Sequence, residues 1–99
     1  MADEQQIATA QGNGNSTGVA ISRHAHIHEN HLRTLLVGGT FDSATVKYQV
    51  SLDDTTYFDV ANADTITADK AINVEHRAPF HRINVTGGGG SVAIDAYVI

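Results

Sequence analysis

Three histidines at alternate positions, His24, His26 and His28, are the side chains of this sequence best placed for chemistry. In an extended strand, side chains two positions apart project from the same face at intervals of about 6.6–6.8 Å. Imidazole nitrogens bind Zn²⁺ and Fe²⁺, so such a face, or several copies of it around a symmetry axis, can reach one ion. No other set of spaced His or Cys residues completes a metal motif. We therefore interpret this segment first as a metal-free polar strand face and second as a zinc or iron site.

The four consecutive glycines of Gly87–Gly90 have the flexibility of a phosphate-binding loop. Such a loop needs a helix N-terminus after it and usually a lysine. Here the next residues, Ser91 to Ile94, have the pattern of a strand. The sequence therefore predicts a glycine-rich hairpin rather than a nucleotide site.

Four aspartates, Asp42, Asp53, Asp54 and Asp59, could in principle form a calcium site or an acid/base pair. Their spacing does not follow an EF-hand loop, and aspartate is common in turns because its side chain bonds the nearby backbone. No serine lies in a nucleophile-elbow motif either. We predict turn aspartates, no bound cofactor and no enzymatic activity.

Composition narrows the classes of partner. The 99 residues contain no Cys, and six Lys and Arg stand against eleven Asp and Glu, a net charge of −5 with neutral His. Binding to a phosphate backbone needs concentrated positive charge, so nucleic acid is an unfavourable partner. No segment has the roughly 20 apolar residues of a membrane span, and the acidic first residues differ from a signal peptide. We expect synthesis in the cytoplasm and no membrane partner.

The elements that must position these side chains are strands. Val46, Tyr48 and Val50 alternate with polar residues, and this period of two is typical of a strand with one face in a core. Strands separated by turn signals every 8–12 residues predict an all-β fold, an antiparallel β-sandwich of about 7–8 short strands, with jelly-roll connections as one arrangement. The predicted strands cover residues 19–28, 31–37, 44–51, 56–60, 65–67, 71–75, 81–86 and 91–99.

Residues 1–18 differ from the rest in having few apolar side chains. Such a segment gains too little from burial to offset the entropy of ordering it. We predict a flexible N-terminal arm over 1–18 and a β-sandwich domain over 19–99. The residues expected to contact neighbouring subunits are Ile7 in the arm, Arg23, His31 and Arg77.

Two segments carry a resemblance to a known family. TFDSATVKYQVSLD, residues 40–53, and YFDV, residues 57–60, are followed by PFHRINVTGG, residues 79–88. Together they resemble a pattern of small tailed-phage structural proteins, G-x-F-x-G-A-T-V-x-L-Q-x-S-x-D-G-x-T-W-x-x-V, followed by an aromatic-x-R strand and a Gly-rich turn. The sequence departs from it at Ser43 and Asp54, where Gly is usual, and at Tyr57, where Trp is usual.

The resemblance implies a virion component. The nearest type is a head decoration (cement) protein, which acts as a homotrimer or other small oligomer on the capsid exterior and has the major capsid protein as its partner. The alternative is a tail-fibre or host-adhesion module that binds glycan, with Tyr57 and Tyr97 as candidate stacking residues.

Overall fold

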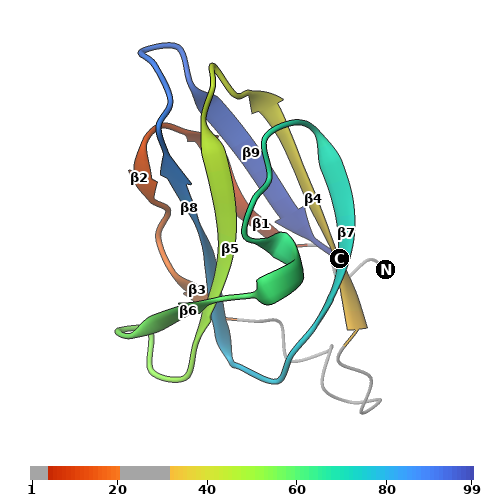
Figure 1. The fold of residues 1–99 in the computed structure, drawn as a ribbon. Coiled ribbons are helices and arrows are strands. Elements are labelled where there is room, and N and C mark those ends of the chain that lie inside the picture. Colours follow the sequence, from red (N-terminus) through yellow and green to blue (C-terminus); the bar gives the residue numbers. More distant parts are fainter. Residues whose placement is uncertain (1–4, 21–31) are drawn as a thin grey trace.

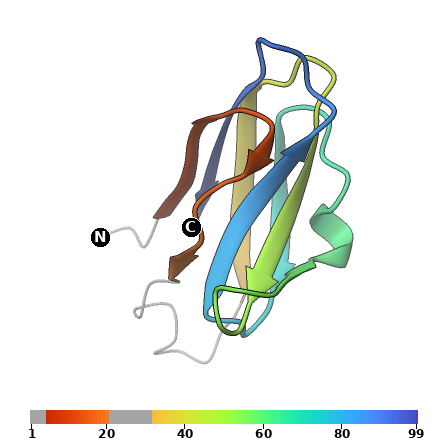
Figure 2. The ribbon, with the colours of Figure 1, turned by 90° about the vertical axis from the view of Figure 1, so that its left-hand side faces the viewer.

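The fold is a sandwich of two antiparallel β-sheets, seen face-on in Figure 1 and edge-on in Figure 2. A computed structural model describes residues 5–20 and 32–99. The predicted all-β sandwich is confirmed. In chain order the elements are β1 (Gln5–Gln11), β2 (Gly14–Asn15), β3 (Val19–Ala20), β4 (Leu32–Thr40), β5 (Thr45–Ser51), β6 (Tyr57–Asp59), the 3₁₀ turn η2 (Ala61–Ala63), β7 (Lys70–Glu75), β8 (Phe80–Thr86) and β9 (Ala93–Val98).

The strand order is that of a jelly roll. Sheet A has the order β1-β9-β4-β7, and sheet B has the order β2-β8-β5-β6, with β3 also pairing with β8. Because β2 and β3 lie along the same strand, β8, they act as one interrupted strand. Most connections therefore pass from one sheet to the other, and only β5 and β6 are joined as a hairpin among the described neighbours.

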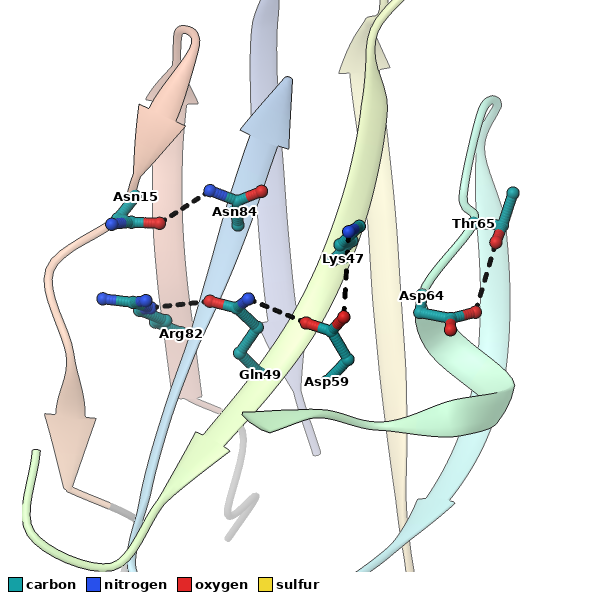
Figure 3. A network of polar contacts seen from close by, with 8 residues as sticks. All are labelled: Asn15, Lys47, Gln49, Asp59, Asp64, Thr65, Arg82 and Asn84. Atoms are coloured by element: carbon teal, nitrogen blue, oxygen red, sulfur yellow. Dashed lines mark hydrogen bonds and ion pairs between the residues drawn. The ribbon is translucent and has the colours of Figure 1, made fainter. Parts of the chain in front are cut away.

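The core lies between the sheets and follows the period-two pattern. On β5, Val46 and Tyr48 are fully buried, while Lys47 and Gln49 lie on the outer face of sheet B (Figure 3). Removing each large apolar side chain from water contributes about 1.5–3 kcal/mol, which offsets the entropy of ordering the strands. The buried apolar residues are Ile7, Ala8, Leu35, Val37, Ala44, Val46, Tyr48, Ala63, Ile66, Val74, Ile83, Val85, Ile94, Ala96 and Val98.

The prediction of a hairpin at Gly87–Gly90 is wrong. The segment crosses from β8 in sheet B to β9 in sheet A, so it is an arch between the sheets. A hairpin would place β9 beside β8, but β5 pairs with one edge of β8, and β2 and β3 pair with the other. The arch is held by Asn13, whose side chain donates to Gly88 O at 2.8 Å and accepts from Gly88 N at 2.9 Å.

The predicted flexible arm over 1–18 also differs from the structure, in which the sandwich begins at Gln5. Strand β1 pairs with β9, and Ile7 and Ala8 are 4% and 7% exposed in the core. Ser16 forms two hydrogen bonds with the backbone of Ile83: its N donates to Ile83 O, and its side-chain Oγ accepts from Ile83 N. This polar segment is ordered because its backbone completes the edges of both sheets. Ile7 therefore belongs to the core of its own chain and is not available as a subunit contact.

Replacing Ile7 tests whether the N-terminal segment is part of the core. Ile7→Ala should lower the free energy of unfolding by about 2–5 kcal/mol, because it leaves a cavity against β9. Thr9→Ala, at an exposed position of the same strand, should change it by less than about 0.5 kcal/mol. Urea denaturation of both variants measures the difference. Equal effects of the two substitutions would indicate a detached arm.

Gly39 supplies a second test, because its backbone is left-handed at φ +123° inside β4. A Cβ there would lie 2.3 Å from the carbonyl oxygen of Ala93 on β9. We expect Gly39→Ala to destabilise the protein by at least about 2 kcal/mol. The matched control is Gly90→Ala, where a Cβ meets no atom within 4 Å and the change should stay below about 1 kcal/mol.

Candidate functional site

The outer face of sheet B carries a connected row of polar side chains, here called the outer ladder: Lys47, Gln49, Asp59 and Arg82. Gln49 lies between Arg82 on β8 and Asp59 on β6 in the strand register. Arg82 Nε donates to Gln49 Oε1 at 2.8 Å, and Gln49 Nε2 donates to Asp59 Oδ1 at 2.8 Å. Lys47 Nζ lies 3.7 Å from Asp59 Oδ2 (Figure 3). The ladder thus ties three strands together across a flat, solvated face.

A second polar pair extends this face toward the N-terminal segment. Asn15 on β2 is opposite Asn84 on β8, and Asn84 Nδ2 donates to Asn15 Oδ1 at 2.7 Å (Figure 3). Asn84 is in turn opposite Lys47 on β5. Polar residues therefore continue over β2, β8, β5 and β6 of sheet B.

Tyr57 on β6 packs under the guanidinium group of Arg82, whose Cζ lies 3.9 Å from the ring centroid. This is the geometry of a cation–π contact. The Tyr57 hydroxyl donates to Asp54, and partial burial together with this carboxylate raises the pKa of Tyr57 to about 12. One ring face and the hydroxyl group are thus occupied within the chain.

The turn between β5 and β6 is shaped by Ser51 and Asp53. Ser51 Oγ accepts from the backbone N of Asp53 and of Asp54, at 3.1 and 2.9 Å. Asp53 Oδ1 accepts from the N of Thr55 and of Thr56, and these bonds hold the pKa of Asp53 below its usual value. The prediction that this aspartate shapes a turn is confirmed.

A chain of hydrogen bonds crosses the interior and links the two sheets. Tyr48 Oη lies 3.0 Å from His76 Nε2 and 2.8 Å from His81 Nδ1. On its other side, His81 Nε2 lies 2.7 Å from Gln5 Oε1 on β1. Gln5 Nε2 donates to Ala20 O at 2.7 Å, which orients the amide so that Oε1 faces His81.

These partners assign a direction to each bond in the chain. Because Gln5 Oε1 only accepts, His81 Nε2 carries the proton and its Nδ1 accepts from Tyr48 Oη. Tyr48 Oη therefore accepts from His76 Nε2. In this arrangement His81 is neutral, because its Nδ1 accepts from the Tyr48 hydroxyl. Desolvation, with smaller contributions from the charges of His76 and Arg33, lowers the pKa of His81 to about 3.

Tyr48 and His81 are 0% exposed, so a substrate in solution cannot contact them. Burial also raises the pKa of Tyr48 well above its ordinary value. Their role is to satisfy each other inside the sandwich. Sequence reasoning missed this network, although His81 has the same parity on its strand as the inward Ile83 and Val85.

The other candidate residues are not brought into one site within the described part of the chain. The predicted metal ligands His24, His26 and His28, and the predicted contacts Arg23 and His31, lie outside the described residues. Arg77 is exposed between β7 and β8. Among residues 5–20 and 32–99, no three His, Asp or Glu residues gather in a metal-binding arrangement.

Comparisons of the chain with protein-family models, with curated proteins and with solved structures found no match. Within the described ranges, no helix has the length and apolar character needed to cross a membrane.

The buried histidine predicts how stability depends on pH. The pKa of His81 is about 6.5 in the unfolded chain and about 3 in the folded protein. Above pH 6.5 both states are neutral and stability is complete. Between pH 6.5 and 3 only the unfolded state binds a proton at His81. The free energy of unfolding should therefore decrease by about 1.4 kcal/mol for each unit by which the pH falls.

Urea denaturation from pH 8 to 4 measures this slope. The His81→Gln variant has no titrating group at this position. It should be less stable than the natural protein at pH 8, but its free energy of unfolding should fall less steeply with decreasing pH, by about 1.4 kcal/mol per pH unit. Parallel curves for the two proteins would contradict the assignment of a neutral His81.

Proposed function

We propose that this chain is a structural protein of a phage virion, a decoration (cement) protein that stabilises the head by binding the capsid exterior where capsomers meet. It acts by contact alone, as a homotrimer or other small oligomer, with the major capsid protein as its partner. The proposal starts from the resemblance of residues 40–60 and 79–88 to small tailed-phage structural proteins.

The contact between Tyr57 and Arg82 carries the proposal, because it joins the two separated segments of the pattern. The first segment has Trp where Tyr57 stands, and the second has the aromatic-x-R whose arginine is Arg82. In space these residues pack at 3.9 Å, and Gln49, another residue of the pattern, accepts from Arg82 Nε. Gln49 and Arg82, which match the pattern, and Tyr57, which stands at its Trp position, thus meet on one face of sheet B.

Two of the three departures from the pattern also support the resemblance. Ser43 and Asp54 stand where the pattern has Gly, and both have a left-handed backbone, with φ +72° and +62°. Glycine adopts this conformation at little cost, and Asp and Ser do so less readily. A Gly in the related proteins is therefore what these two turns would favour.

The β5–β6 hairpin presents apolar side chains suited to a contact with another subunit. Leu52 is 80% exposed and Phe58 is 65% exposed. Burying such groups contributes roughly 25 cal/mol per Å², and a symmetric particle repeats the contribution over many copies. The net charge of −5 would keep unbound copies soluble.

The glycan-binding alternative has less support on sheet B than on sheet A. Arg82 covers one face of the Tyr57 ring, which a sugar would otherwise stack on. Tyr97 lies instead in an open groove beside Asp95, on the outer face of sheet A. A glycan array with the isolated domain distinguishes this alternative from capsid binding.

Purified virions test the proposal. Mass spectrometry should find the chain in hundreds of copies per particle, whereas a handful of copies would point to the tail. Particles made without the chain should lose infectivity on heating sooner than complete particles. Adding back the purified protein should restore survival, and the Leu52→Ser, Phe58→Ser double variant should restore it less. Equal survival of both kinds of particle would contradict the proposal.

A further inference from the structure

The outer face of sheet A contains an open groove of about 630 Å³ that the outer ladder and the buried network do not use. It crosses strands β9, β4 and β7, which lie side by side in Figure 1. In the strand register Leu36 lies between Tyr97 and Ala71, and the next outward position along β4 is Gly38, opposite Asp95. Ala71 adds little bulk beside Leu36 and Tyr97, and the Asp69 carboxylate lies over Gly38, where a Cβ would meet its Oδ1 at 3.3 Å.

The walls of the groove are mostly apolar. Leu36 is 41% exposed, which is unusual for a leucine in the middle of a central strand. Tyr97 is half-buried, so its ring lines the groove and is still reachable from solvent. This surface suits an aliphatic or planar group, which would lose contact with water on entering.

Two carboxylates, Asp69 and Asp95, lie at the same groove. Asp69 Oδ1 accepts from Gly39 N at 3.2 Å, and Asp95 Oδ1 accepts from Ala10 N at 2.8 Å. The second oxygen of each has no hydrogen-bond partner among the described residues. Lys70 also lines the groove, but within the described part of the chain it forms no ion pair with either aspartate. The groove therefore combines apolar walls with a net charge of −1.

We propose that this groove binds an arginine side chain presented by a partner protein. The methylene groups of the arginine would lie over Leu36 and Ala71. Its guanidinium group would donate to the second oxygens of Asp69 and Asp95 and stack on the Tyr97 ring. A planar cation with several donors and an apolar stem satisfies all three features at once.

Charge complementarity points to a partner rather than to a second copy of this chain. The protein carries five net negative charges, so a basic partner is attracted to this groove more strongly than another acidic chain. A sugar would match Tyr97 and the carboxylates but would gain little from Leu36 and Ala71. The inference does not depend on the proposed virion role, because it concerns the chemistry of the groove.

Two capped tripeptides test the groove: Gly-Arg-Gly, and the same peptide with citrulline, which is the neutral isostere of arginine. Titration of the ¹⁵N-labelled full chain should shift the amide signals of Gly38, Gly39, Ala71 and Tyr97 with the arginine peptide. The citrulline peptide should bind at least about fivefold more weakly, since it lacks the charge that faces the two carboxylates.

Matched variants show whether the carboxylates are responsible. Asp69→Asn and Asp95→Asn keep the Oδ1 acceptors of Gly39 N and Ala10 N, so both proteins should fold, and each should weaken the arginine peptide severalfold. Asp59→Asn, on the opposite face of the sandwich, should leave its binding unchanged.

Several results would overturn the inference. Equal binding of the two peptides would show that the groove recognises only apolar groups. The absence of amide shifts with either peptide would show that the groove does not bind arginine. Shifts of the same amides on raising the protein concentration without peptide would assign the groove to a second copy. Stronger shifts from methyl glycosides than from the arginine peptide would assign it to glycan. None of these results bears on particle survival, so the two proposals fail separately.

Discussion

The interior hydrogen-bond chain from His76 through Tyr48 and His81 to Gln5 is the constraint on which the rest of the structure depends. A tyrosine and a histidine stand fully buried among aliphatic residues, where unpaired polar groups are costly. Each bond satisfies the next group, and the chain ends at an amide of the first strand. The network fixes Tyr48 and His81 of sheet B against Gln5 of sheet A, so it sets both the packing of the sheets and the place of the N-terminal segment. It also makes the fold depend on a neutral histidine.

The N-terminal segment extends this constraint to both sheet edges. Residues 5–20 pair first with β9 and then with β8, so one segment closes the same side of the sandwich in both sheets (Figure 2). Its contacts are mostly polar: Gln5 with His81, Asn13 with Gly88, and Ser16 with Ile83. With the interior satisfied and these edges covered, the molecule presents a polar outer face on sheet B and a partly apolar one on sheet A. The two outer faces of the sandwich therefore differ in chemical character.

The sequence predicted the parts of this fold that depend on neighbouring residues. Alternation along β5, β8 and β9 predicted the strands and their inward side chains, since period two reflects burial directly. The N-terminal strands were missed, because a polar segment that pairs with residues far along the chain, as Gln5 does with Val98 and Asn15 with Asn84, has the same composition as a disordered one. The arch at Gly87–Gly90 was missed because glycines allow either a hairpin or a crossing, and the choice depends on which strands already flank β8. The groove beside Leu36 was also beyond the sequence, since it needs the register of three strands.

The state of His81 tests the central claim most directly. Two-dimensional ¹H–¹⁵N spectra of the imidazole nitrogens should show one protonated Nε2 and one unprotonated Nδ1, unchanged from pH 8 down to about pH 4.5, because the folded protein keeps His81 neutral. Exchange between the two tautomers, or titration with a midpoint near pH 6.5, would contradict the account.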